Sequence, residues 1–292
     1  MSRLLVQGLA GLALIAVFWS VSWLHLDPVG RHSFFGLWLG YILMVDAVVL
    51  WRRGESLLTR NPAGFVLMFV ASASLWWAFE GINQLTDNWH YLGVSHYSFL
   101  QYGLLATWNF SVVIPGVFET AELLSAFGVV RRFRHGPKLR LPGSTLVVIS
   151  AFGVLMIPAM ALWPRFVFPV AWMSLFLIVD PVNLALGRPS IASDLRRGDW
   201  GNVAALALGA LVCGWFWEMW NFRALPKWEY TIPYLGFARV FEMPVLGYLG
   251  YLPFGLEVYA GYHFLAGWFN RLGTTSILVI EQPAGEPANR AT

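Results

Sequence analysis

Glutamate and asparagine recur at one fixed spacing within two long apolar stretches of this sequence. Glu80 and Asn83 lie three residues apart, and Glu218 and Asn221 repeat that pair 138 positions later. Residues three apart share one face of a helix, so each pair is expected to point in one direction. A positioned glutamate can give or take a proton, which makes general acid–base catalysis the first chemistry to consider.

A second glutamate follows each pair at a fixed distance. Pro115 and Glu119 recur as Pro253 and Glu257, again 138 positions later. Proline in a helix interior removes a backbone hydrogen bond and frees a carbonyl in the preceding turn. The sequence therefore predicts backbone polarity beside these glutamates, near the middle of their helices. The candidate catalytic residues are Glu80, Glu119, Glu218 and Glu257, and the sequence leaves open whether all four line one shared cavity.

Tryptophan gathers around Glu80 and Glu218, in a chain that has 16 Trp, 22 Phe and 10 Tyr. Many Trp and Tyr side chains of membrane proteins belong to interfacial belts. Aromatic walls beside an acid also suit an apolar substrate and can stabilise a developing cation. In a structural alternative, each glutamate only bonds a neighbouring Asn, Trp N–H or backbone group and locks the helices together. The candidate substrate-binding residues are Asn83, Asn221, Trp76, Trp77, Trp215, Trp217 and Trp220.

The composition places these residues in a membrane. Of the 292 residues, 58% are hydrophobic and 12% are charged, whereas a soluble domain has about 25% charged residues. The apolar runs approach the ~20 residues that a helix needs to cross the hydrocarbon core. Helices are expected because backbone polar groups must be satisfied within the lipid. The predicted spans are 4–24, 34–51, 63–85, 106–130, 144–162, 166–186, 201–222 and 244–269.

The matches at constant offset indicate an internal duplication. Upstream of the glutamates, Asp46 and Ser56 recur as Asp180 and Ser190, with an offset of 134. An even number of spans in each copy makes the copies parallel, related by a pseudo-twofold axis along the membrane normal. We predict an all-α integral membrane protein of about eight transmembrane helices in two parallel four-helix repeats. The predicted units are 1–140 (first repeat), 141–270 (second repeat) and 271–292 (a short cytoplasmic tail).

The basic residues predict the orientation. Of the 19 Lys and Arg, 14 lie in the segments that would share one side with the N-terminus. The positive-inside rule then places both termini in the cytoplasm of a cell, in its plasma or inner membrane. The sequence pI of 9.1 is thereby explained by loops that face anionic lipid, without nucleic acid as a partner. Alternatively, the first span is a signal peptide cleaved near Ser20–Ser22.

Other chemistry has little support in the sequence. Cys213 is the only cysteine, and none of the six histidines recurs between the two copies. The sequence has no phosphate loop, dinucleotide fingerprint or serine-nucleophile motif. We predict no cofactor and no metal, although the four glutamates leave a carboxylate metal centre as a minor alternative. Gly36 and Gly40 form a small-x-x-x-small pattern that favours close helix packing.

Three functions remain open, so whether the protein is an enzyme is not decided by the sequence. The first is a membrane-embedded enzyme that acts on a lipophilic, isoprenoid-like small molecule through glutamate acid–base chemistry. The Trp-Glu and Pro-x-x-x-Glu fragments are similar in kind to those of membrane-integral terpene and carotenoid cyclases, which pair acidic residues with apolar helices. The second is a proton- or cation-coupled transporter or channel, because buried carboxylates serve as relays. The third is a non-catalytic subunit that binds membrane lipid or assists assembly.

Overall fold

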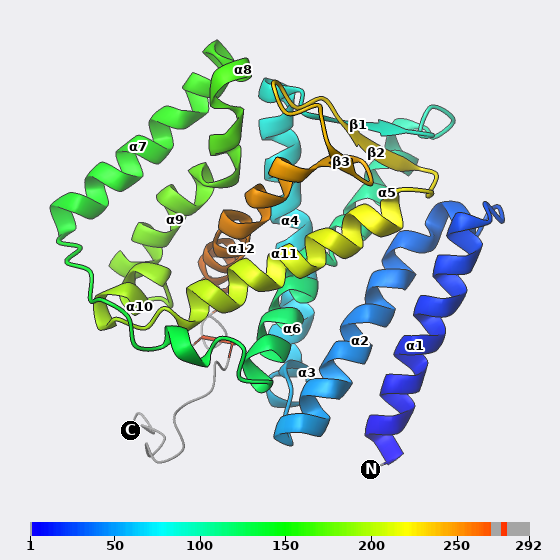
Figure 1. Ribbon diagram of the computed structural model, residues 1–292, viewed down its shortest axis with the longest axis horizontal. Helices are drawn as coiled ribbons and strands as arrows, with labels where there is room; N and C mark the ends of the chain where they lie inside the picture. Colours follow the sequence, from blue (N-terminus) through cyan, green and yellow to red (C-terminus); the bar gives the residue numbers. More distant parts are fainter. Residues whose placement is uncertain (1, 270–275, 279–292) are drawn as a thin grey trace.

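The computed structural model describes residues 2–269 and 276–278, and this part of the chain is mostly helical (Figure 1). The predicted tail, 271–292, lies outside the described residues except for 276–278. The helices of the first half are α1 (Ser2–Trp23), α2 (Ser33–Arg53), α3 (Leu57–Arg60), α4 (Pro62–Thr86), α5 (Phe99–Phe110) and α6 (Val113–Ala126). Those of the second half are α7 (Gly143–Leu162), α8 (Pro164–Val167), α9 (Ser174–Ala185), α10 (Ile191–Arg197), α11 (Gly201–Asn221) and α12 (Tyr251–Ala266).

Seven helical segments are long and apolar enough to cross a membrane, which confirms the coarse prediction of an all-α membrane protein. They are Leu4–Trp23, Gly30–Arg53, Pro62–Thr86, Phe99–Ala126, Gly143–Leu162, Pro164–Ala185 and Gly201–Asn221. The expected eighth span, 244–269, contains a 3₁₀ helix, η4 (Val245–Gly250), and the 16-residue α12. Helix α12 alone is shorter than the ~20 residues of a full span. The number of transmembrane helices, eight, therefore remains a prediction.

The outer helices present apolar surface. Figure 1 shows α1 and α7 at opposite sides of the bundle, with α4, α6, α11 and α12 between them. Only 6% of the apolar window in Leu4–Trp23 and 11% of that in Gly143–Leu162 is buried. Exposed apolar faces of this length suit contact with lipid rather than water.

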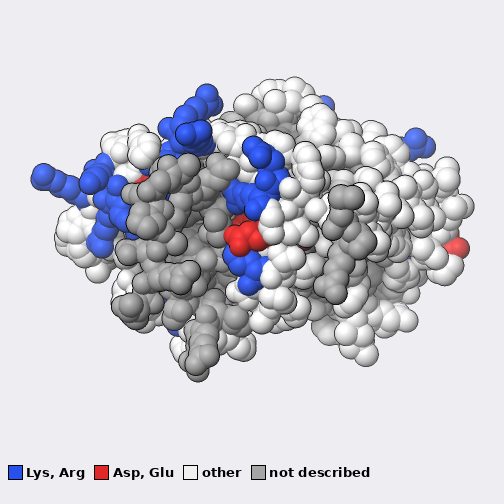
Figure 2. Space-filling model, turned by 90° about the horizontal axis from the view of Figure 1, so that it is seen from below, with Lys and Arg blue, Asp and Glu red and all other residues white. Residues whose placement is uncertain are grey.

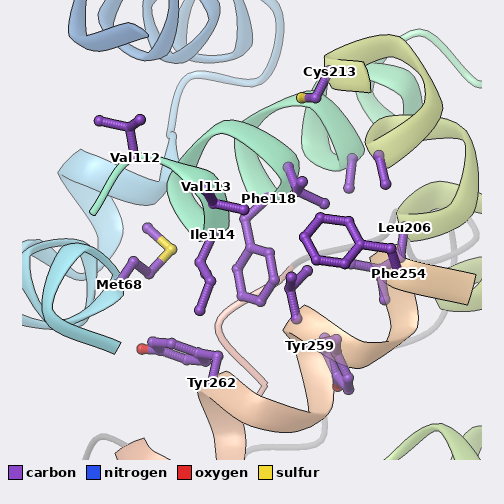
Figure 3. Packing of buried hydrophobic residues seen from close by; sticks show 14 of the residues in the cluster. Met68, Val112, Val113, Ile114, Phe118, Leu206, Cys213, Phe254, Tyr259 and Tyr262 are labelled. Carbon is purple, nitrogen blue, oxygen red and sulfur yellow. The ribbon is translucent and has the colours of Figure 1, made fainter. Parts of the chain in front are cut away.

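The core lies where helices of both halves meet (Figure 3). Phe118 of α6 stacks edge-on against Tyr262 of α12 with ring centroids 5.4 Å apart. Met68 of α4 and Leu206 of α11 are also fully buried in this cluster. The second half therefore packs directly on the first rather than forming a separate domain.

One predicted span is broken, and a serine from another helix compensates for the break. Helix α5 ends at Phe110 and α6 begins at Val113. The Ser72 hydroxyl donates to the Phe110 carbonyl and accepts from the Val113 and Ile114 N–H groups at 2.6–3.1 Å. These bonds satisfy backbone groups that the break would leave unpaired. Pro115 therefore stands in the first turn of α6, not within an uninterrupted helix as the sequence suggested.

Close packing of α1 on α2 requires glycine at position 40. A β-carbon on Gly40 would lie 2.8 Å from the Gly11 carbonyl oxygen and 2.9 Å from the Ile15 nitrogen. Gly40→Ala is therefore expected to push the helices apart and cost about 1–3 kcal/mol of stability. Gly81→Ala in α4 is the control, because nothing lies within 4 Å of its β-carbon, and it should be neutral or stabilising. Equal melting temperatures of both variants in detergent would contradict this packing.

One end of the bundle contains the N-terminus, α3 and α10 (Figure 1). Figure 2 shows this face from below, with basic side chains spread over it and acidic side chains between basic ones near its centre. Arg60 of α3 is ion-paired with the buried Glu122 and with Glu55. The opposite end carries the short strands β1 (Trp89–Leu92), β2 (Lys227–Tyr230), β3 (Arg239–Val240) and β4 (Met243–Pro244).

Candidate functional site

Asn83 and Asn221 hold the strands that follow their helices. The Asn83 side-chain oxygen accepts from the Asn88 and Trp89 N–H groups at 2.9 and 3.2 Å, and its amide donates to the Trp89 carbonyl at 2.8 Å. Asn221 accepts from the Trp228 N–H at 2.8 Å and donates to the Trp228 carbonyl at 2.7 Å. Both predicted binding residues thus form hydrogen bonds with the backbone of a strand, and these bonds fix where each strand begins.

The strands fixed in this way join the two halves of the chain. Strands β1 and β2 pair antiparallel, with Trp89 opposite Tyr230 and Tyr91 opposite Trp228. Alternate residues of a strand point to the same face, so these four aromatic side chains lie on one side of the ribbon. All four line the same cavity.

Glu80 is hydrogen-bonded to this aromatic set. Its Oε1 atom accepts from the Tyr91 hydroxyl at 2.6 Å and from the indole N–H groups of Trp76 and Trp89 at 3.0 and 3.1 Å. Trp76 lies one turn earlier in α4, whereas the other two donors come from β1. Residues four apart share one helix face, so Trp76 reaches Glu80 from within α4, and the strand adds two further partners.

Glu218 has an equivalent environment in the second half. Its Oε1 atom accepts from the hydroxyls of Tyr230 and Tyr251, each at 2.7 Å. The Trp228 indole in turn donates to the Tyr230 oxygen at 2.8 Å. Burial, followed by the nearby glutamate, raises the pKa of Tyr230, and the same two causes act on the pKa of Tyr91. Both strand tyrosines therefore stay protonated at neutral pH and act as hydrogen-bond donors.

A cavity of about 440 Å³ lies between the halves beneath the β1–β2 ribbon. This volume falls within the range of small-molecule sites, which are mostly apolar with a few placed polar groups. Its rim includes the exposed apolar side chains of Met173, Leu246 and Leu249. The predicted binding residues that line it are Trp76, Trp217, Trp220 and Asn221.

Two predicted tryptophans lie away from this cavity. Trp77 is 40% exposed and donates its indole N–H to the Thr107 hydroxyl. Trp215 is 47% exposed and packs on the rings of Phe241 and Tyr248. Each stands three residues before its glutamate, a spacing that places two residues near each other on a helix but does not decide whether the ring turns toward the cavity. Here the rings turn instead to Thr107 of α5 and to Phe241 and Tyr248.

The four glutamates do not share one cavity wall. Glu80 and Glu218 reach the cavity through tyrosine hydroxyls, and neither is itself a lining residue. Glu257 is buried and accepts from the Leu175 and Phe176 N–H groups at the start of α9, at 2.9 and 3.3 Å. Backbone N–H groups at a helix start are natural partners of a carboxylate. Glu257 thus stabilises the entry of α9.

Glu119 lies elsewhere, in the polar layer of α6. It is fully buried, and neither of its carboxyl oxygens has a hydrogen-bond partner among the described residues. The carboxyl groups of Asp46 and Glu122 are its acidic neighbours, and Arg60 is the nearby cation. An unpartnered buried carboxyl group is costly, so Glu119 is the glutamate whose surroundings least resemble a purely structural role.

Asp46 and Asp180 hold the short helices at the opposite end of the bundle. Asp46 accepts from the Ser56 hydroxyl at 2.9 Å and from the Leu58 N–H at 3.1 Å. Asp180 accepts from the N–H groups of Ile191 and Ala192 at 2.7 and 2.8 Å. Each aspartate thus caps the helix that follows it, α3 or α10.

Sequence reasoning missed the tyrosines that connect the glutamates to the cavity. A signal for two of them existed, because Trp89-His-Tyr91 resembles Trp228-Glu-Tyr230 with a shift of one position. Tyr251 had no such signal, because valine stands at the matching position, 113. Among the residues that the structure describes, no group of three or more His, Cys, Asp or Glu is placed to hold a metal ion.

Asp194 in α10 is expected to make stability depend on pH. Burial raises its pKa to about 6, against the opposing effects of Asn202 and Arg197. The folded state then holds the proton more tightly than the unfolded chain, whose aspartate pKa is about 3.9. Protonated Asp194 therefore adds at most about 3 kcal/mol to the free energy of unfolding. This contribution is fully present below about pH 4 and is lost as the pH rises through 6. Asp194→Asn should flatten the melting temperature between pH 4 and 6, and an unchanged pH profile would contradict the assignment.

The chain resembles none of the proteins with which it was compared. No protein-family model matches it, and neither does any curated protein or solved structure.

Proposed function

We propose that this protein is a membrane-embedded enzyme that acts on a lipophilic, isoprenoid-like small molecule by acid–base chemistry. The observation that carries the proposal is that two glutamates are hydrogen-bonded to three tyrosines at one aromatic cavity. Tyr91 connects Glu80 to the cavity, and Tyr230 and Tyr251 connect Glu218 to it. The aromatic wall suits an apolar substrate, and the tyrosine hydroxyls are the groups that such a substrate would touch.

The hydrogen bonds suggest how a proton would move. A tyrosine hydroxyl in the cavity takes a proton from the substrate as it gives its own proton to the glutamate behind it. The reverse transfer delivers a proton to the substrate. Because the O···O distances are 2.6 and 2.7 Å, each pair is already within the range for such a transfer. Glu80 and Glu218 are then the proton reservoirs, and Tyr91, Tyr230 and Tyr251 are the residues in contact with the substrate.

The proposal includes two parallel four-helix repeats that meet at this cavity, in units 1–140 and 141–270. Matched contacts support it: Asn83 and Asn221 bond the next strand, and Glu80 and Glu218 bond its tyrosine. We also propose that both termini are cytoplasmic in a plasma or inner membrane. The basic residues on the face near the N-terminus support this orientation (Figure 2).

A proton-coupled transporter is the second candidate, and Glu119 is the observation in its favour. A buried carboxyl group with two unpartnered oxygens beside Asp46 is the kind of group that proton relays use. A transporter needs a gradient across a membrane, whereas an enzyme converts its substrate without one. Detergent solution, which has no gradient, therefore separates the two functions.

The test is to incubate the purified protein in detergent with an isoprenoid-rich lipid extract and to follow the components by mass spectrometry. The enzyme proposal predicts that one lipophilic component is lost as another appears. Tyr230→Phe combined with Tyr251→Phe removes the hydroxyls that connect Glu218 to the cavity and should slow the conversion. Absence of any conversion by the folded wild type would argue against catalysis.

A further inference from the structure

Part of the cavity wall is made of apolar side chains that are also exposed. Met173 directly follows the 3₁₀ helix η3 (Phe168–Trp172), and Leu246 and Leu249 belong to η4 (Val245–Gly250). All three line the cavity, and they are 38%, 47% and 59% exposed, respectively. The wall of the cavity therefore meets the outer surface of the protein at these residues.

The two 3₁₀ helices approach each other at this place. A β-carbon on Gly250, at the end of η4, would lie 3.3 Å from Cδ1 of Trp172, at the end of η3. Met173 and Leu249 are the chain neighbours of these two residues, and consecutive Cα atoms are about 3.8 Å apart. The exposed side chains from η4 and from the end of η3 thus border one opening, which we call the η3–η4 mouth.

The surface around the η3–η4 mouth suits lipid. Met173 lies within Pro164–Ala185, one of the segments that are long and apolar enough to cross a membrane. Phe166 and Val245 do not line the cavity, yet they are 73% and 48% exposed, so they face outward beside the mouth. Apolar side chains exposed together mark a contact with lipid or a partner rather than with water. In a membrane protein the mouth therefore opens to the hydrocarbon.

The cavity is bordered by charged residues elsewhere. Arg31 of η1 (Gly30–His32) lies between α1 and α2, across the bundle from α8 and α9 (Figure 1). It is ion-paired with Asp27 at 2.8 Å, and Lys227, which also lines the cavity, is ion-paired with Glu242 at 2.6 Å. Charged groups hold water strongly, so a lipophilic molecule that entered past these pairs would displace their water at a cost in free energy.

We infer that a lipophilic substrate enters and leaves the cavity sideways, from the bilayer, through the η3–η4 mouth. The inference rests on the proposed function, because it takes a lipophilic substrate as given. Met173 and Leu249 then control passage rather than affinity. An obstacle at the mouth raises the barrier for entry and exit alike, whereas affinity depends only on the free energies of the free and bound states. A change in both rates at constant affinity is therefore the signature of a mouth.

The test uses cysteine chemistry. Cys213 is the only cysteine of the chain and is fully buried, so Met173→Cys and Leu249→Cys each add one accessible thiol. Each full-length variant is reconstituted in lipid nanodiscs, and binding of tritiated farnesol is followed by scintillation proximity before and after modification with N-phenylmaleimide. We expect modification at either position to slow association and dissociation about tenfold each and to leave the Kd unchanged.

Two matched variants locate the effect. Leu155→Cys places the thiol on α7, where Leu155 is 63% exposed and outside the cavity lining. Val94→Cys places it in the cavity wall after β1, two residues from His96, whose ring lies 2.9 Å from Arg31. Neither adduct should change the association rate. Wild type treated with the reagent should also keep its rates, because Cys213 is inaccessible.

The outcomes separate this inference from the proposed function. Unchanged rates in both mouth adducts, or slower association in the Val94→Cys adduct alone, would overturn entry through the η3–η4 mouth and leave the lipophilic site in place. A weaker Kd at an unchanged association rate would overturn it too, since Met173 and Leu249 would then belong to the binding wall. Failure of the folded wild type to bind farnesol would overturn both the mouth and the lipophilic site.

Discussion

Glu218→Gln is expected to lower turnover by about 100-fold or more while the protein still folds. General acid–base catalysis by a positioned side chain contributes about 10²–10⁴-fold to a rate. Glutamine keeps the oxygen that accepts from Tyr230 and Tyr251, both at 2.7 Å, but it cannot take up the proton. The rate of product formation in detergent, measured by mass spectrometry, is the readout.

Glu55→Gln is the control for this loss. Glu55 is 53% exposed, and its ion pair with Arg60 lies at the opposite end of the bundle from the cavity. Turnover by this variant should equal that of the wild type. If Glu218→Gln also retained wild-type turnover, Glu218 would not be a proton reservoir and its bonds to the tyrosines would be structural only.

Asn83→Ala is expected to destabilise the protein by on the order of 3 kcal/mol. The substitution removes the only side chain that bonds the Asn88 N–H and the Trp89 N–H and carbonyl in the described structure. Each buried backbone group left unpaired costs about 1–3 kcal/mol. The melting temperature in detergent should fall by several degrees. Displacement of β1 should also move Tyr91 away from Glu80.

Ser74→Ala in the same helix separates this effect from a general sensitivity of α4. The Ser74 hydroxyl only donates to the Val70 carbonyl within the helix, so its loss should change stability by no more than about 0.5 kcal/mol. Equal melting temperatures for Asn83→Ala and Ser74→Ala would show that strand β1 does not depend on Asn83.

The long helices were predictable because each contains an apolar run long enough to cross a membrane. The expected span 63–85 corresponds to α4 (Pro62–Thr86), and 201–222 corresponds to α11 (Gly201–Asn221). The strands were not predicted, because each has at most four residues and β1 pairs with a partner almost half the chain away. The break between α5 and α6 was hidden for a similar reason, since Ser72 of another helix stabilises it.

The site was predictable only as far as local spacing reaches. Spacing placed Trp76 on the same helix face as Glu80, and the hydrogen bond between them is present. Spacing does not say which helices are neighbours, so it left open whether Glu119 and Glu257 reach the same cavity as Glu80. In the fold, Glu257 instead meets the start of α9. Tertiary packing decided which glutamates reach the aromatic wall.

A lipophilic substrate that binds in the aromatic cavity and reacts with Glu80 and Glu218 should co-purify with the protein. The most direct measurement is mass spectrometry of the lipids that co-purify with the wild type and with the Glu80→Gln, Glu218→Gln double variant. We predict an isoprenoid-like species enriched over bulk lipid in both samples and chemically different between them, because the variant would retain unconverted substrate. Recovery of bulk phospholipid alone from both proteins would contradict the account.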